Sequence, residues 1–375
     1  MAVIGAVLAS SPGHTRRSVT RAGPVRLLSG VPARGSYAGI FVGGENLWWV
    51  ARRPQAVAGA WLHDGLSPLL PDNHGAEVDE LAAVRGGVVA HIADISTGIT
   101  YGALGCVVFI PAALAPDRVL CRVTVIAVAP GGEKVWVQTA VQHSNGGEGV
   151  PATFRSPTWA VNLAGRPVSP ALRLPLGLVG ATEQGPLTQN LATGKLQLWS
   201  GATGRLLPLP VPANAEFVAA GRDKLVWQSS ASALHITDLR TGSDVAVPVP
   251  AHWVPPSETY PPVPASFDST GQRVVLALDR VDSSGNLSAE DLFVVDTTTR
   301  TVRMILSKPL PISSSGVLPA DTLAGSWDSR GRLWVLVMSP ADSYYQLGYW
   351  TGAGPLHTVP IAQGLPTTLV APGPS

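Results

Sequence analysis

The sequence predicts an all-β fold built from repeated four-stranded antiparallel sheets. Its 375 residues include 40 Gly and 34 Pro, a composition that favours short strands and tight turns over long helices. Two kinds of hairpin recur and alternate along the chain. A single hydrophobic core stops growing at roughly 250–300 residues, so a chain of 375 residues needs either several domains or a repeated unit. Repeated sheets meet that requirement.

The first repeated phrase is a Gly- or Asp-centred turn followed by a β-branched or Trp-containing run. Its two clearest copies are SFDSTGQRVVLAL at 266–278 and SWDSRGRLWVLVM at 326–338. A weaker copy lies at 183–191, between Val135 and Leu225, where the 90-residue step corresponds to two periods. The steps between the other copies are 41, 47, 90, 49 and 59 residues, measured between Leu47, Val88, Val135, Leu225, Val274 and Leu333.

A second series of hairpins interleaves with the first, each a strand, a polar turn and a strand that ends in Pro or apolar residues. The turns contain the dipeptides Asp-Gly, Ala-Gly or Thr-Gly, whose Gly adopts the positive φ that tight hairpin turns require. Two hairpins per unit make one four-stranded blade, so the sequence predicts a seven-bladed β-propeller, with six or eight blades left open and a β-sandwich array as the alternative. The seven copies lie at 60–71, 100–111, 158–175, 196–210, 234–250, 292–306 and 347–361.

The phrase FDSTGQRVVLAL…LFVVDTTTRTVRMI resembles the bacterial TolB/YVTN-type, WD40-like propeller repeat, with its turn Gly and its V-x-D-x-x-T outer hairpin. SWDSRGRLWVLV is similar, over one blade, to the propeller part of actinobacterial LpqB-type lipoproteins. The chain has neither room for the amino-terminal module of that family nor its lipid-bearing Cys. The repeat resemblance, over about residues 36–362, implies the fold and no ligand.

The predicted domains are a lead-in at 1–21, the propeller at 22–368 and a disordered tail at 369–375. The lead-in opens on an apolar run, Ala2–Ala9, that is shorter than the ~20 residues needed to span a bilayer. It is interpreted either as the remnant of a membrane or signal segment, which would provide a membrane tether, or as a frayed cytoplasmic terminus. We expect an extracytoplasmic, membrane-anchored or secreted protein, with a cytoplasmic one as the alternative. Residues 22–35 resemble the last outer strand and are predicted to complete the last blade or to pair beside it.

The connections predict which face of the disc carries function. Turns within hairpins are short and lie on one face, the tight-turn face. Connections between hairpins and between blades lie on the other, the long-loop face, and long loops in compact domains are usually functional or disordered. The sequence places long loops there at 71–80, 113–122, 142–157, 250–266, 279–291, 307–325 and 339–346.

The composition of these loops favours a protein or peptide partner. Rigid aromatic side chains are typical of interface hot spots, and the Pro-rich segment 255–264 would stiffen its loop. Alternatively, the tyrosines cover strand ends and the Pro-rich insertion is a solvated spacer. The candidate binding residues are Trp253, Tyr260, Tyr344, Tyr345, His252 and His143.

Motifs for catalysis and cofactor binding are sparse. The chain has no GxSxG, GxxxxGK[ST] or HExxH, and we predict no catalytic residue, cofactor or metal. His74 with Asp72 and Glu77 forms a weak metal candidate that is better interpreted as a solvated turn. Cys106 and Cys121 are a disulfide candidate if the chain is exported, although two buried thiols are the favoured interpretation.

These observations predict a non-enzymatic propeller scaffold that binds a protein or peptide through its long-loop face, in the bacterial cell envelope. A net charge of +1 gives no reason to expect nucleic acid, and a monomer is expected. One alternative is a hydrolase or lyase with its active site at the mouth of the channel, and another is a small-molecule sensor. Two carboxylates, or a His and a carboxylate, converging at that mouth would favour the enzyme.

Overall fold

A computed structural model describes the strands of the chain and most of its shorter turns. Within the described ranges the chain forms strands and turns and no helix. The described residues are 37–43, 46–51, 57–61, 76–94, 105–111, 118–139, 155–190, 193–229, 233–247, 249, 251–254, 266–284, 287–309, 323–328, 331–339, 344–354, 356–361 and 366–370.

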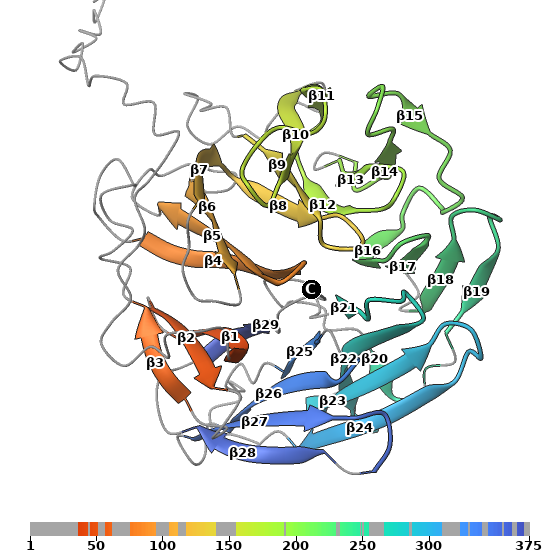
Figure 1. The fold of residues 1–375 in the computed structure, drawn as a ribbon. Coiled ribbons are helices and arrows are strands. Elements are labelled where there is room, and N and C mark those ends of the chain that lie inside the picture. The colour runs from red at the N-terminus through yellow and green to blue at the C-terminus, as the bar shows by residue number, and fades with distance from the viewer. Residues whose placement is uncertain are drawn as a thin grey trace, which may run out of the picture.

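The described strands form seven antiparallel sheets around a common centre (Figure 1). The four sheets that follow β3 (Val57–Trp61) in the chain each contain four consecutive strands. They are β4 (Ala76–Val84), β5 (Gly87–Asp94), β6 (Gly105–Pro111) and β7 (Arg118–Val123); β8 (Val125–Val128), β9 (Lys134–Gln138), β10 (Ser156–Asn162) and β11 (Leu172–Leu174); β12 (Leu178–Ala181), β13 (Pro186–Gln189), β14 (Leu196–Trp199) and β15 (Leu206–Leu207); and β16 (Glu216–Ala220), β17 (Lys224–Gln228), β18 (Leu234–Asp238) and β19 (Asp244–Ala246).

The next sheet differs because two short strands share its innermost position. Both pair with β22, one with its beginning and the other with its end. This sheet consists of β20 (Trp253–Val254), β21 (Ser266–Phe267), β22 (Arg273–Val281), β23 (Leu287–Asp296) and β24 (Val302–Pro309). It is followed by a sheet of β25 (Leu323–Trp327), β26 (Leu333–Ser339), β27 (Tyr344–Trp350) and β28 (His357–Ile361).

The remaining sheet joins the two ends of the described chain. Its innermost strand is β29 (Pro366–Val370), which pairs with β1 (Tyr37–Gly43), and it continues through β2 (Asn46–Ala51) and β3 (Val57–Trp61). The carboxy-terminal strand therefore completes the first sheet. That residues 22–35 complete the last blade or pair beside it stays a prediction. Residues 22–35 lie outside the described chain. β29 also runs to Val370, into the segment predicted as a tail.

The innermost strands contact one another in sequence around the centre. β4 contacts β8, and the series continues through β12, β16, β21, β25 and β29, which in turn contacts β4. Sheets placed radially in this way bury both faces against their neighbours. The chain is therefore an all-β propeller of antiparallel, four-stranded blades, as the sequence predicts.

In the first sheet, each amino-terminal strand lies one position further out than the sequence predicts. Because β29 takes its innermost position, the turn in 43–51 joins the second and third strands, not the first and second. Segment 60–71, predicted as an outer hairpin, begins with the end of the outermost strand β3. Segment 100–111 was also predicted as a hairpin, but its described residues form the single strand β6.

Several predicted long loops are shorter because strands extend into them. β7 occupies the second half of 113–122. Because β6 and β7 form one hairpin, the connection between them belongs to the tight-turn face and not to the long-loop face. β22 and β23 reduce 279–291 to a turn between Val281 and Leu287. β4 begins inside 71–80 and β27 inside 339–346.

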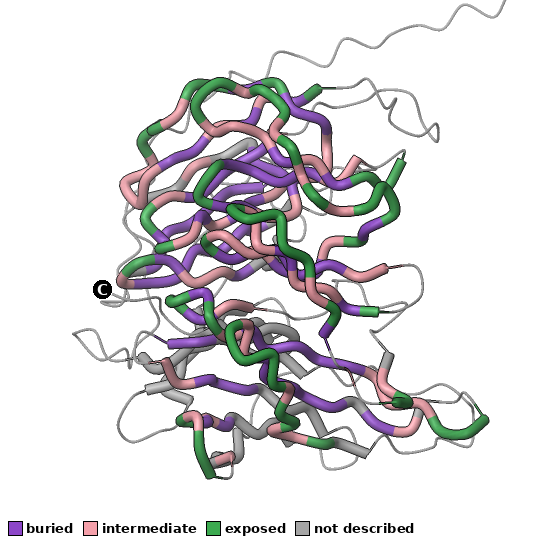
Figure 2. The backbone as a smooth tube through the Cα atoms, turned by 90° about the vertical axis from the view of Figure 1, so that its right-hand side faces the viewer, coloured by how far each residue is buried: buried purple, intermediate pink, exposed green. Residues whose placement is uncertain are grey.

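Among the described residues, the blade of β22 and β23 packs through apolar side chains against the blade before it and the blade after it. Figure 2 shows that the exposed residues of the described chain lie mainly along its turns. Trp136 is 1% exposed and packs against Gly201 of the next sheet, where a Cβ would lie 2.9 Å from the indole. Trp334 is also buried. The Trp residues of the repeated phrase therefore serve packing at these two positions, while the side chain of Trp48 is outside the described set.

The repeated phrase owes its shape to a buried aspartate. In the 266–278 copy, Asp268 Oδ1 accepts hydrogen bonds from Thr270 Oγ1 at 2.8 Å and from the backbone of Gln272 and Arg273 at 3.0 and 3.2 Å. Its Oδ2 accepts a bond from Arg273 Nε at 2.9 Å. Asp328 in the other copy accepts corresponding bonds from the backbone N–H and the guanidinium of Arg332. The motif is therefore a turn that is held together internally.

The cysteines lie on adjacent strands. Cys106 on β6 and Cys121 on β7 are directly opposite in register, and Cys106 is disulfide-bonded. The described chain contains no free cysteine, so the favoured sequence interpretation of two separate thiols is wrong. Neighbouring antiparallel strands place Cβ atoms about 4.5–5.5 Å apart, close enough for a disulfide with little backbone movement.

Candidate functional site

Few of the predicted binding and metal residues have described side chains. His143, Tyr260, His74 and Asp72 lie outside the described residues, and Glu77 is described only as part of β4. Of the predicted aromatic residues, Trp253 is the one whose side chain can be placed.

Tyr344 and Tyr345 were predicted on a loop, but they are the first two residues of β27. They pair with Ser339 and Met338 on β26. This difference arises because β-propensity of the tyrosines extends the strand towards the long-loop face.

Trp253 lies at the long-loop end of its blade, in the short inner strand β20 rather than in a loop. Its half-buried indole packs edge-on against Phe293, with ring centroids 5.9 Å apart. Its Nε1 donates a hydrogen bond of 2.6 Å to Asp291 Oδ2. The Arg280 guanidinium carbon is 5.8 Å from the ring centroid. The indole is thus fixed by a hydrogen bond, an aromatic contact and a cation.

His252 precedes this strand and shapes the entry to it. Its side chain is exposed, its φ is 76°, and its carbonyl accepts a 2.8 Å bond from the Val281 N–H. A positive φ is uncommon outside Gly and is held here by the pairing of β20 with β22. His252 therefore projects to solvent next to Trp253 in sequence.

Asp291 is the most deeply buried charged group at this end of the blade. It is fully buried, and the Arg280 Nε lies 3.7 Å from its Oδ2. Its Oδ1 is buried and has no hydrogen-bond partner among the described residues. A buried carboxylate oxygen left without a donor is costly, so this oxygen marks an incomplete polar arrangement.

Asp279 is a second carboxylate at the same end of the blade. Burial raises its pKa from 3.8 to about 6. In the pairing of β22 with β23, Leu278 is opposite Asp291, whereas Asp279 is opposite Glu290. Side chains alternate across a sheet, so Asp279 and Asp291 project from opposite faces. The two carboxylates do not converge, and the condition set above for favouring an enzyme is not met by this pair.

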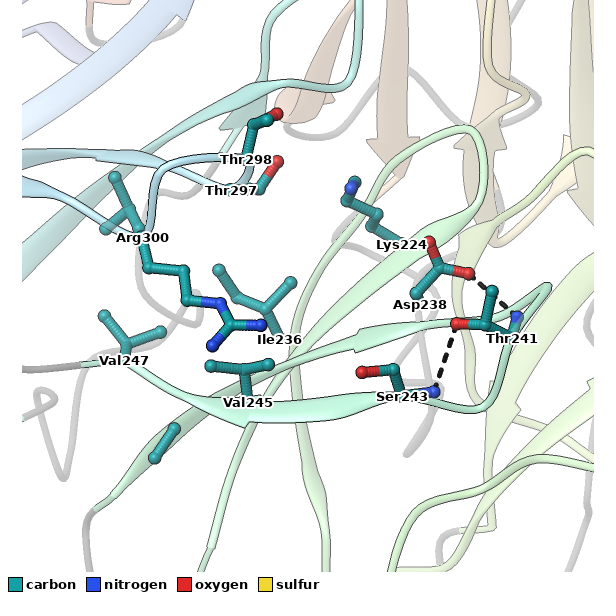
Figure 3. Close-up of a pocket in the computed structure, with 12 residues that line it drawn as sticks. Lys224, Ile236, Asp238, Thr241, Ser243, Val245, Val247, Thr297, Thr298 and Arg300 are labelled. Carbon is teal, nitrogen blue, oxygen red and sulfur yellow. Dashed lines mark hydrogen bonds between the residues drawn. The ribbon is translucent and has the colours of Figure 1, made fainter.

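A pocket of about 210 Å³ lies between two blades on the opposite, tight-turn side (Figure 3). One wall is formed by β17, β18 and β19, and the other by the end of β23 and the turn before β24. Its floor is aliphatic and its rim is polar, with Lys224, Asp238 and Arg300 as the charged residues. This pocket could not be predicted from the sequence, because it depends on how two blades meet.

Other site types receive no support from the described chain. Within the described ranges, no group of three His, Cys, Asp or Glu residues is arranged to hold a metal ion. A search of the same residues finds no helix of the length and apolarity required to cross a membrane.

Comparisons with known proteins do not assign a family. No family model matches the chain, and no curated protein matches it.

Several solved structures have a related fold at low identity. The propeller domain of the Trilobed protease from Pyrococcus furiosus shares 13% identity and a TM-score of 0.47, over 78% of this chain and 86% of that domain. AztD from Citrobacter koseri shares 12% identity and a TM-score of 0.46, over 89% of this chain and 96% of that one. Puromycin hydrolase shares 14% identity and a TM-score of 0.45, over 86% of this chain and 52% of that one. Likenesses this weak carry no argument about ligand or activity, and the propeller fold rests on the sheets themselves.

Proposed function

We propose that this protein is a non-enzymatic scaffold that binds a protein or peptide through its long-loop face. The observation that carries the proposal is the fixed indole of Trp253. It lies at the long-loop end of its blade, half-buried, and is held by Asp291, Phe293 and Arg280. An aromatic side chain that is already ordered loses little entropy on binding, which is why Trp and Tyr dominate interface hot spots.

A displayed library of random dodecapeptides provides the test. We expect the full chain to enrich peptides, and the Trp253→Ala, Tyr344→Ala double variant to bind them at least about tenfold more weakly. Trp227→Phe is the matched control, because Trp227 is a buried indole of the neighbouring blade that donates to Thr237 Oγ1 at 2.8 Å. It should bind as the wild type does. Equal binding by a double variant that melts cooperatively, or no enrichment, would overturn the proposal.

We also propose that the propeller closes as a ring of seven blades. The support is the cycle of contacts between innermost strands, in which β29 contacts both β25 and β4. Ending the chain at Gly364 removes β29 and leaves the edge of β1 unpaired. Backbone hydrogen exchange in β1 should then accelerate about tenfold or more, while β17, in a distant blade, keeps its protection. Unchanged protection of β1 in the truncated chain would contradict the closure.

The disulfide supports a third proposal, that the protein functions outside the cytoplasm. Disulfides persist mainly in oxidising compartments. Alkylation of unfolded but unreduced protein, isolated from its own organism, should leave Cys106 unmodified. Quantitative modification of Cys106 under these conditions would argue for a reducing compartment.

A further inference from the structure

We infer that the pocket on the tight-turn side binds an aliphatic carboxylate, such as the carboxy-terminal end of a peptide or a free aliphatic acid. This site is separate from the long-loop face and does not depend on the function proposed for that face.

The size and lining of the pocket select a small aliphatic group. Ile236 and Val245 face each other in register across β18 and β19, and Val247 and Val295 add buried aliphatic surface. The volume of about 210 Å³ is below the roughly 300–1,000 Å³ of pockets for drug-sized ligands. A single aliphatic side chain or the end of an alkyl chain fits this space, whereas a larger ligand does not.

The charges at the rim select an anion. Asp238 Oδ1 already accepts backbone bonds of 2.9 Å from Arg240 and Thr241. Burial on its own would raise the pKa of Asp238. The backbone bonds and the charge of Lys224 outweigh this effect, so the pKa lies below its ordinary value of 3.8. Its charge therefore stabilises the turn and partly compensates Lys224. Arg300 has no ion pair among the described residues, and Figure 3 shows its guanidinium reaching across the pocket towards Ile236 and Val245.

The backbone at Arg300 provides independent support. In three outer turns, the fifth residue donates its N–H to the carbonyl of the first at 2.8 Å; these are Gly204 to Ser200, Gly242 to Asp238 and Arg300 to Asp296. All three residues have positive φ, of 65°, 72° and 62°. Gly adopts this conformation without strain, whereas Arg does not. A strained residue that persists where its counterparts are Gly suggests that its side chain has a role.

The chemistry of a guanidinium fits a carboxylate. Arg presents a planar set of donors that can form two parallel hydrogen bonds with a carboxylate, and such charge-assisted bonds are roughly twice as strong as neutral ones. Lys224 adds a second cation on the rim. An aliphatic carboxylate would thus place its chain on the valine and isoleucine floor and its charge at Arg300.

The test uses the full chain and three defined probes, followed by NMR titration. N-acetyl-leucine mimics a peptide end, N-acetyl-leucinamide is its neutral match, and hexanoate represents a free aliphatic acid. We expect at least one acid to bind, and N-acetyl-leucinamide to bind about tenfold or more weakly than N-acetyl-leucine. Tighter binding of N-acetyl-leucine than of hexanoate would identify a peptide end, and the reverse order a free acid.

Arg300→Gly is a sharp variant because it restores the residue found in the equivalent turns. It should fold at least as well as the wild type and bind the acids about tenfold or more weakly. Arg240→Gln is the matched control, since Arg240 lies on an adjacent turn, pairs with Asp223 and does not line the pocket. Undiminished binding by Arg300→Gly, equal binding of the amide, or no binding of any probe at about 10 mM overturns the inference.

Discussion

The two ends of the blade formed by β20–β24 each contain a buried aspartate with an arginine nearby, yet the two arrangements differ. At the tight-turn end, both oxygens of Asp268 are occupied by donors, and Arg273 contacts it at 2.9 Å. At the long-loop end, one oxygen of Asp291 accepts a hydrogen bond, the other has no partner in the part of the chain that the structure describes, and Arg280 lies 3.7 Å away.

The difference separates a carboxylate whose donors come from its own turn from one whose donor comes from a distant strand. Donors from the same turn satisfy Asp268, so its role is complete within the blade. The strongest donor to Asp291 is the indole of Trp253, which comes from a strand 38 residues away. The long-loop end therefore depends on contacts between distant strands, whereas the tight-turn end is held by one continuous segment.

The largest expected loss of stability comes from removing the Asp268 carboxylate at the tight-turn end. Asp268→Ala leaves the Arg273 guanidinium and two backbone N–H groups without their acceptor. We expect the free energy of unfolding, measured by urea denaturation, to fall by about 3 kcal/mol. Asp296→Ala removes a more exposed turn acceptor of the same blade and should cost about 1 kcal/mol. An equal or smaller loss for Asp268→Ala would contradict the comparison.

A smaller effect is expected when the same conservative change is made at both ends. Asp268→Asn places an amide against the Arg273 Nε and should cost about 2 kcal/mol in the free energy of unfolding. Asp291→Asn keeps an acceptor for Trp253 Nε1 and should cost about 1 kcal/mol or less. Urea denaturation of the two variants side by side measures the difference, and a larger loss at Asp291 would reverse the assignment of roles.

The smallest effect concerns pH. Burial raises the pKa of Asp279 to about 6, so between about pH 4 and 6 the unfolded chain releases this proton while the folded chain keeps it. This group therefore destabilises the fold progressively as pH rises through that window. Asp279→Asn should stabilise the protein at pH 7 by about 1 kcal/mol, since solvent screens a half-buried group, and should give no gain below pH 4.

Thermal melts of Asp279→Asn and wild type from pH 4 to 7 measure that difference. Glu290 is opposite Asp279 on β23, so the difference between the two proteins, and not the wild-type curve alone, isolates Asp279. Asp282→Asn, in an exposed turn, is the control and should follow the wild type. A constant offset at all pH values would argue against the raised pKa.

The sequence predicted the blades well because their turns carry local signals. Gly86, Gly242 and Gly271 all have positive φ at tight turns, and such positions can be recognised without knowledge of the fold. Closure of the ring could not be predicted in this way. The strand at 366–370 is short and has no characteristic turn beside it. Its pairing with β1 depends on the arrangement of all the blades between the two strands.

The sites were harder to predict, for related reasons. Trp253 was identified as a binding residue, but its strand has two residues and forms only because β22 extends beside it. Asp291 lies among acidic and small residues whose alternation does not reveal the buried face. The role of Arg300 becomes visible only when its φ is compared with those of the equivalent glycines. Each depends on contacts between segments distant in sequence.

The pairing of β29 with β1 has a consequence for biosynthesis. The first blade cannot be completed until residue 370 has been made, about 300 residues after β3. At translation rates of about 5–20 residues per second, β1 waits roughly 15–60 s for its partner strand. During that interval its unpaired edge can recruit strands from other chains. The nascent protein is therefore expected to depend on chaperones until its last strand arrives.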